Sequence, residues 1–223
     1  MSEPSFPLTM PTNRNFVRSE WKLKRSVAVT KSPFTYASQA AKYTGSQWCA
    51  SVSLPPMSRA EASEWVAFFA QLNGNFGTFL MGDPDAKNIR GSMSNTFKVK
   101  TAAAIGAFDV VIYLADTSEN GALKKGDYVQ FGSAGTSRLH MIIADVNVDG
   151  NGEATMQIEP PLKTAVAEDD VVVYTNTVCV MRMQTPDLSW SADRISLYGI
   201  SFAAEEVTWE KALYIFFFLW WLF

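Results

Sequence analysis

Apolar and polar residues alternate along several stretches of the chain, the pattern typical of β-strands with one buried face. In the basic stretch 16–29 the apolar positions recur with a period close to two, and residues 46–54 alternate in the same way before Pro55-Pro56. We expect a strand in each stretch, the first with its basic face in solvent. A further strand is expected at residues 76–81.

One helix is predicted between these strands. Ser58 and Glu61 have the spacing of a capping box, in which the hydroxyl and the carboxylate satisfy free backbone amides at a helix start. An apolar stripe at helical spacing follows, and Asn73-Gly74 supplies residues that tolerate the left-handed conformation at a helix end. The stripe consists of Ala62, Trp65, Val66, Phe69 and Leu72. The predicted helix spans residues 59–72 and lies across a sheet.

After the turn-rich sequence Gly82–Asp85, the chain to residue 174 is dominated by patterns of short strands. Residues 138–148 and 153–158 are predicted to form a hairpin around Asp149-Gly150-Asn151-Gly152. The other expected strands are 108–114, 127–131, 171–183, 188–190 and 195–203.

Composition narrows the function before any site is considered. The chain has 223 residues, a net charge of −3, a single histidine and two cysteines 130 positions apart. Clustered zinc ligands are therefore excluded, and a nucleic-acid-binding face is not expected as the main function. We expect Cys49 and Cys179 to be reduced and buried, and we find no sign of a secretory leader at the start of the chain.

Three sets of polar residues were weighed as sites. Asp145, Asn147 and Asp149 copy the first half of a calcium loop, but its twelfth position holds Met156 instead of glutamate, which favours a polar turn. His140 lies within an apolar strand pattern without a nucleophile motif, and Asp83-Pro84-Asp85 is typical of a turn. We therefore expect no catalytic, metal or cofactor site.

Charge is distributed unevenly along the chain. Residues 14–31 hold six basic side chains and one acidic one, and residues 145–170 hold seven acidic and one basic. This separation suits contact between identical subunits in a closed ring. The alternative is that the two patches face each other within one subunit.

Several blocks of the sequence resemble a family of phage proteins. They are LPPMSRAEASEW at 54–65, NFGTFLMGDPD at 75–85, KGDYVQFG at 125–132, RLHM at 138–141, IEPPL at 158–162 and DRISLYGISF at 193–202. In their order these blocks are similar to distal tail proteins of long-tailed bacteriophages. The resemblance covers residues 14–207.

The resemblance implies a tail-tube-like fold, a β-sandwich or split barrel with one flanking α-helix, plus an inserted small β-barrel-like domain. Residues 1–82 and 177–210 would form the first domain, 83–176 the insertion and 211–223 an apolar C-terminal segment. The implied function is a structural virion protein that forms a ring, commonly a hexamer, at the distal end of the tail. Its partners would be the tail tube protein and the tail-tip hub or central fibre proteins. DNA would pass through without sequence-specific binding, and the chain would be made in the bacterial host cytoplasm.

The chain continues beyond the resemblance into twelve consecutive apolar residues, 212–223. A helix of that length spans about 18 Å, short of the roughly 30 Å hydrocarbon core, so we expect no stable membrane anchor. The segment needs cover, either from a neighbouring tail-tip protein or from its own subunit; membrane contact during genome ejection is the third alternative. The expected contact residues are Tyr214, Phe216, Phe217, Phe218, Trp220, Trp221 and Phe223.

Three other functions were considered. A major tail tube subunit would share the fold, and a carbohydrate-binding module could use Tyr113, Tyr128 and Phe131 on the insertion. An enzyme that cleaves peptidoglycan would need a placed acid pair, for which Asp83 and Asp85 are the available residues.

Overall fold

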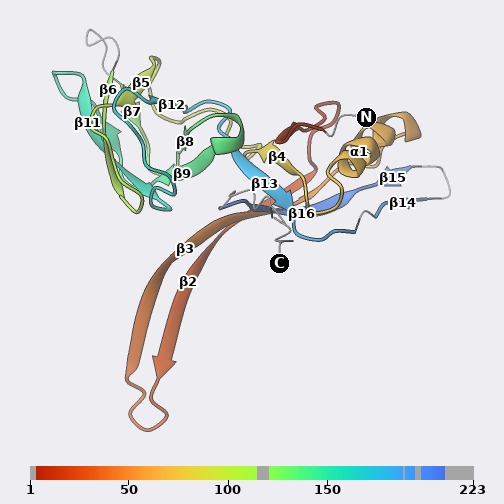
Figure 1. Ribbon diagram of the computed structural model, residues 1–223, viewed down its shortest axis with the longest axis horizontal. Helices are drawn as coiled ribbons and strands as arrows, with labels where there is room; N and C mark the ends of the chain where they lie inside the picture. The colour runs from red at the N-terminus through yellow and green to blue at the C-terminus, as the bar shows by residue number, and fades with distance from the viewer. Residues whose placement is uncertain (1–3, 115–120, 188, 194–196, 209–223) are drawn as a thin grey trace, which may run out of the picture.

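The computed structural model describes residues 4–114, 121–187, 189–193 and 197–208. Within them the fold is mainly β with one α-helix, which confirms the predicted fold class. Two six-stranded sheets form the body, and two further pairs of short strands lie beside them. A long ribbon leaves the body between the second sheet and the helix (Figure 1).

The first sheet takes its strands from both ends of the chain. Its order is β1-β4-β13-β16-β3-β2, antiparallel except for the short parallel pair β1–β4. The strands are β1 (Leu8–Thr9), β2 (Arg18–Lys31), β3 (Ser38–Ser53), β4 (Thr78–Met81), β13 (Cys179–Met183) and β16 (Ser201–Glu206).

Helix α1 (Arg59–Gln71) covers the core face of the first sheet, as the sequence predicts. The backbone N–H and the hydroxyl of Ser58 both donate to the Glu61 carboxylate, each at 3.0 Å. These hydrogen bonds lower the pKa of Glu61, and Asn73 ends the helix at a φ of 52°. Aromatic rings pack against one another between the helix and the sheet, most of the pairs edge to face. They are Phe16, Trp65, Phe68, Phe69, Phe79 and Phe202.

The second sheet forms a nearly closed barrel in the order β12-β5-β6-β11-β9-β8. Reciprocal backbone hydrogen bonds of 2.7 and 3.0 Å between Gln130 and Val173 join its two edges. Side chains such as Phe97, Ile112 and Met156 fill its interior. The strands are β5 (Phe97–Val99), β6 (Asp109–Leu114), β8 (Tyr128–Phe131), β9 (Arg138–Ile142), β11 (Glu153–Glu159) and β12 (Val171–Val172).

Shorter elements complete the fold. β7 (Ala122–Leu123) pairs with β10 (Val146–Asn147), and β14 (Ser191–Ala192) pairs with β15 (Tyr198–Gly199). A 3₁₀ turn, η1 (Ala134–Thr136), lies between β8 and β9.

The two sheets meet through strand β9, which is buried on both faces. His140 and Ile142 face the barrel interior, while Leu139 and Met141 pack against the core of the first sheet. Trp48 donates its indole N–H to the Leu139 carbonyl at 2.9 Å. Gly82 and Thr177 lie so close that a Cβ on Gly82 would be 1.8 Å from the carbonyl oxygen of Thr177. The chain therefore leaves and re-enters the first sheet at one point.

Several sequence predictions of strands were wrong in detail, and Ser189 and Trp190 of the predicted strand 188–190 lie outside any strand. Residues 38–45 extend β3, although no strand was expected there. The hairpin of 138–148 with 153–158 does not form as predicted, because residues 153–157 pair with β6 and only Ile158 and Glu159 pair with β9. The apolar run 171–183 divides into β12 and β13, with Asn176 at a positive φ between them.

Candidate functional site: an exposed hairpin arm

The distal halves of β2 and β3 project from the body as a two-stranded ribbon, residues 26–45, which we call the arm (Figure 1). Strand β16 pairs with β3 only at Cys49–Ser53. Along the arm, therefore, both outer edges of the ribbon lack a partner strand among the described residues. A two-stranded ribbon is marginally stable alone, so its attachment to the six-stranded sheet fixes the base of the arm.

The pairing register shows which side chains share a face of the arm. Trp21 and Leu23 stand opposite Ala50 and Trp48 on the core face of the sheet. A bulge between Arg25 and Val27 shifts the register by an even number of residues, so the same face continues into the arm. The continuing stripe, which we call the arm stripe, consists of Arg25, Val27, Val29, Ala40 and Lys42.

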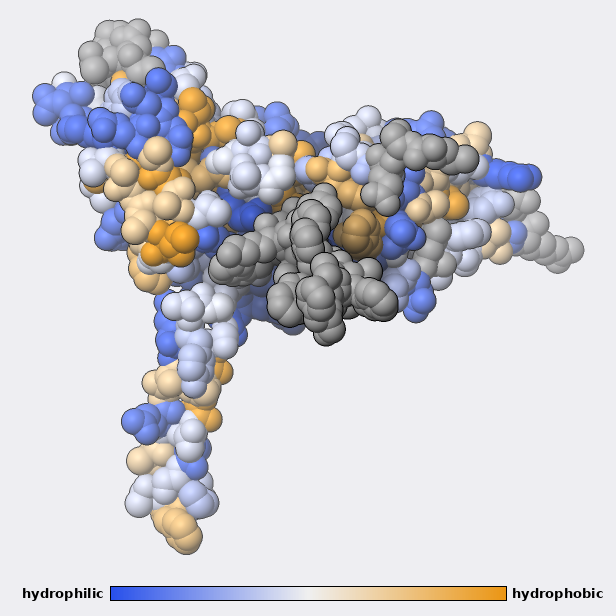
Figure 2. Space-filling model, in the orientation of Figure 1, coloured by the Kyte–Doolittle hydropathy of each residue, from blue (hydrophilic) through white to orange (hydrophobic). Residues whose placement is uncertain are grey.

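The arm stripe is exposed where the body no longer covers it. Trp48 is only 3% exposed at the base, whereas Val29 is 65% exposed on the arm. Apolar residues recur along the arm as far as its tip (Figure 2). Half-exposed or more exposed aromatic and branched residues are concentrated here: Val27, Val29, Phe34, Tyr36 and Tyr43.

The tip is a hydrogen-bonded turn that displays two aromatic rings, Phe34 and Tyr36. Ser32 and Ala37 are joined by a backbone hydrogen bond of 2.9 Å, and the Ser32 hydroxyl accepts the N–H groups of Phe34 and Thr35, each at 3.3 Å. The Lys31 ammonium lies 5.0 Å from the centre of the Tyr36 ring. Phe34, 92% exposed, therefore stands on a built turn with no cover from its own subunit in the described residues.

Two contacts join the base of the arm to the second sheet. The Arg25 guanidinium lies 3.5 Å from the buried Glu159 carboxylate, and the Lys42 ammonium lies 4.7 Å from the centre of the Phe108 ring. Both residues belong to the arm stripe, so the stripe faces the second sheet at its root.

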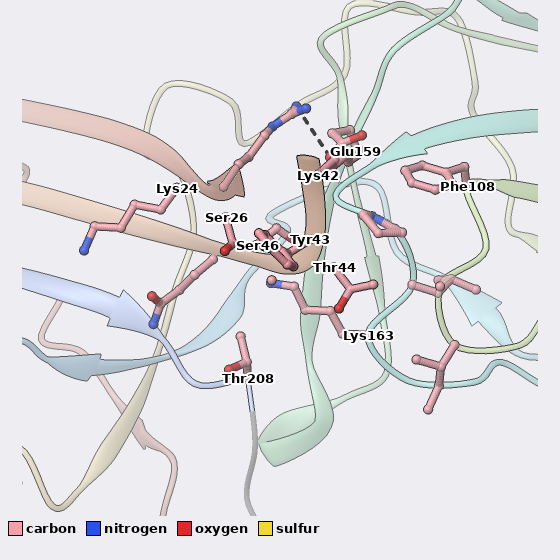
Figure 3. A pocket seen from close by; sticks show the side chains of 17 residues that line it. Lys24, Ser26, Lys42, Tyr43, Thr44, Ser46, Phe108, Glu159, Lys163 and Thr208 are labelled. Atoms are coloured by element: carbon pink, nitrogen blue, oxygen red, sulfur yellow. Dashed lines mark ion pairs between the residues drawn. The ribbon is translucent and has the colours of Figure 1, made fainter. Parts of the chain in front are cut away.

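A cleft of about 1040 Å³ opens at this root, with the strands of the arm on one side and the second sheet on the other (Figure 3). Its walls include four basic side chains, Lys24, Arg25, Lys42 and Lys163, and one acidic one, Glu159. Lys163 pairs with Glu206, whose buried carboxylate also accepts the Trp48 backbone N–H at 3.1 Å. The last described residue, Thr208, forms part of the wall.

The candidate catalytic residues form hydrogen bonds within the fold or are buried in its core. His140 is fully buried with its Nδ1 2.7 Å from the Pro160 carbonyl, and burial lowers its pKa to about 4. Asp83 accepts the Asp85 backbone N–H at 3.1 Å in a turn, and partial burial raises its pKa. Cys49 and Cys179 are buried free thiols, as predicted.

The partial calcium motif forms a turn whose carboxylates bind backbone amides. Asp149 accepts the N–H groups of Asn151 and Glu153, each at 2.9 Å. Asp145 turns to Lys124 and the Lys125 backbone N–H instead. These hydrogen bonds lower the pKa of both carboxyl groups. Among the described residues, no cluster of three His, Cys, Asp or Glu side chains could hold a metal ion.

Two of the aromatic residues considered for sugar binding are occupied within the fold. Tyr128 packs edge to face on Trp48 at 5.7 Å between centroids, and Phe131 is buried against His140. Tyr113 donates its hydroxyl to Asp169. The predicted contact residues of the C-terminal run, 214–223, lie outside the described residues.

The two charged segments make one ion pair with each other in the described part of the chain, Arg25 with Glu159. Asp145, Asp149 and the acidic run 168–170 remain exposed on the second sheet, as do Lys22, Lys24 and Lys31 on β2. Other members of the two segments pair with residues outside the opposite segment, such as Asp145 with Lys124 and Glu153 with Lys100, so the two segments face each other within the described subunit only at Arg25 and Glu159.

Comparison with models of known protein families and with curated protein sequences found no match to this chain. No helix in the described ranges is long and apolar enough to cross a membrane.

Proposed function

We propose that this protein is a structural subunit that assembles through its arm into a ring at the distal end of a long bacteriophage tail. The arm carries the proposal: a sheet face that begins in the core continues on the same side of the ribbon, past the bulge, beyond the part that its own subunit covers. The ordered blocks that resemble distal tail proteins support the same assignment.

A second copy of this chain is the partner that best fits the arm stripe. The stripe presents the exposed residues Val27 and Val29, and the exposed Lys31 continues the same face toward the tip. The exposed acidic residues 149 and 168–170 offer the opposite charge on another surface of the same molecule. A contact between two different surfaces of the same kind of subunit is heterologous. Such contacts close into a ring when the rotation from one subunit to the next is a whole fraction of 360°. Burial of the apolar positions supplies the attraction, and the charges orient it.

In this proposal the ring, with six subunits as the expected number, joins the tail tube to the tail-tip hub or central fibre proteins, and DNA passes through it during genome ejection. The protein works by assembly and carries out no catalysis. It is made in the bacterial cytoplasm and resides in the virion. A net charge of −3 is compatible with DNA that passes without being held.

Mass photometry and negative-stain imaging of the purified chain test the proposal. We expect discrete rings with a central hole. Val29→Glu places a charge on the arm stripe and should abolish them, while the matched control Thr30→Glu places the same charge on the opposite face one residue later and should leave them intact. A wild-type chain that stays monomeric at micromolar concentration, or equal loss of rings in both variants, would contradict the proposal.

A major tail tube subunit is the second candidate, because a tube also needs lateral contact through such an arm. The same images separate the two: a tube subunit polymerises into long hollow filaments, whereas a distal ring protein stops at one or two rings. The carbohydrate-binding alternative is not favoured, because Tyr128 and Phe131 are packed inside the fold.

A further inference from the structure

The cleft at the root of the arm is lined by exposed apolar side chains and by basic side chains. Ile105 and Phe108 from the second sheet side and Tyr43 from the arm present apolar surface into it, and all three are exposed. Leu162 and Pro161 continue the apolar wall. The cleft therefore offers cover for apolar side chains from elsewhere.

Cationic groups lie beside this apolar wall. Lys24 and Lys42 line the cleft, and Lys42 already lies over the Phe108 ring at 4.7 Å. Ammonium groups held against apolar walls attract the faces of aromatic rings as well as carboxylates. The occupant that fits these walls is an aromatic-rich segment with an acidic residue near the cleft mouth.

The chain itself carries such a segment next to the cleft. Thr208 lines the cleft, and the sequence continues through Trp209, Glu210 and Lys211 to the twelve apolar residues 212–223, six of which are Phe or Trp. Because a residue spans at most about 3.6 Å, the four residue steps from position 208 to the start of the apolar run can span roughly 14 Å at most. We infer that residues 209–223 dock into the cleft of their own subunit, with their aromatic side chains against Phe108, Ile105 and the lysines.

Size and connectivity favour this occupant. The cleft volume of about 1040 Å³ lies at the upper limit of the roughly 300–1,000 Å³ found for small-molecule sites, which suits several residues of a peptide. A segment attached at the cleft wall also competes at an effective concentration of the order of millimolar against any separate molecule. The cleft shares Lys42 and Tyr43 with the root of the arm but not Val29 or the tip, and docking of residues 209–223 in it does not depend on ring formation.

Photocrosslinking of the full chain tests the inference. p-Benzoylphenylalanine replaces Phe108 in the cleft, or Phe76 as a matched control, which is exposed and lies outside the cleft. A mixture of ¹⁵N-labelled and unlabelled protein is irradiated, and the crosslinked peptides are mapped by mass spectrometry. Peptides that combine a labelled and an unlabelled part come from two different chains.

We expect crosslinks from position 108 to residues 209–223 within one chain, with a yield at least fivefold above that from position 76. Mixed-isotope pairs to residues 209–223 would show that a second copy supplies the segment, and would overturn the inference. Crosslinks only to other peptides, or equal yields from both positions, would also overturn it. Proteins that form no rings but give the expected crosslinks would contradict the proposed function alone.

Discussion

The same two strands, β2 and β3, have opposite surroundings in their two halves. Near the body, residues 18–25 and 46–53 lie within the six-stranded sheet, and Trp48 packs against Trp21, Tyr128 and the Leu139 carbonyl. Beyond the bulge, residues 27–31 pair antiparallel with residues 38–42, and toward the tip their side chains have little cover from the described residues.

The difference shows that hydrogen bonding and burial are separable in this hairpin. Beyond the bulge the backbone of the arm is paired like that of the base, but exposed side chains such as Val29 and Phe34 gain little free energy from burial within the subunit. Apolar residues that do nothing for the stability of their own subunit are best explained by a second surface that covers them. The following predictions test this contrast, from the largest expected effect to the smallest.

Trp48→Ala, at the base, should lower the free energy of unfolding by about 3–5 kcal/mol, because a buried indole and its hydrogen bond are lost. Urea denaturation followed by circular dichroism measures it. A loss below about 1 kcal/mol would mean that the base is no better covered than the arm.

Acid should weaken the body and leave the arm unaffected. Burial lowers the pKa of His140 from 6.5 to about 4. Between pH 6.5 and pH 4, therefore, the imidazole is protonated in the unfolded chain and neutral in the folded one. Stability therefore falls as the pH drops from 6.5 to 4, by about 3 kcal/mol from this group. The arm, residues 26–45, contains no His, Asp or Glu.

Because His140 is the only histidine, NMR titration of its imidazole measures the pKa in the wild-type protein directly. A titration midpoint near 6.5 in the folded protein would contradict both the burial of the ring and the expected pH dependence.

Arg25→Met removes the ion pair at the root of the arm and should cost about 1 kcal/mol, since Glu159 is left buried without its partner while the half-exposed Arg25 limits the loss. A double-mutant cycle with Glu159→Gln isolates the interaction. A coupling energy of zero would show that the two residues do not hold the arm against the second sheet.

On the arm itself, Val29→Glu and Thr30→Glu should each change the unfolding free energy of the monomer by less than about 0.5 kcal/mol, since both positions are exposed. Unfolding measured at nanomolar concentration, where mass photometry finds monomers, gives this value. A large loss for Val29→Glu alone would place the arm stripe against its own subunit instead of a partner.

Sequence patterns within a few residues correctly predicted those elements that are stabilised by interactions between near neighbours in the chain. The capping box of Ser58 and Glu61 and the end at Asn73 define α1 to within one residue, because backbone amides within one turn decide them. The turn at Asp83 and the burial of Cys179 followed from neighbouring residues in the same way.

The pairing of distant segments could not be read from such patterns. Residues 153–157 alternate equally well for a partner in β9 or in β6, and the barrel core, into which Val110 and Met156 point, favours β6. Tyr128 and Phe131 were candidate sugar-stacking residues, but the contact between the two sheets places Tyr128 on Trp48, and the barrel core buries Phe131 against His140.

By itself, then, the sequence determined a mainly β chain with one capped helix, reduced buried thiols and polar turns at Asp83 and Asp149, since interactions within a few residues fix each of them. The tertiary structure alone decided that β2 and β3 run past the body as an arm and that a cleft forms at its root. Alternating apolar and polar residues indicate that one face of a strand is apolar. The segments that cover this face are often distant in the sequence, and the packing of the whole chain determines where they lie.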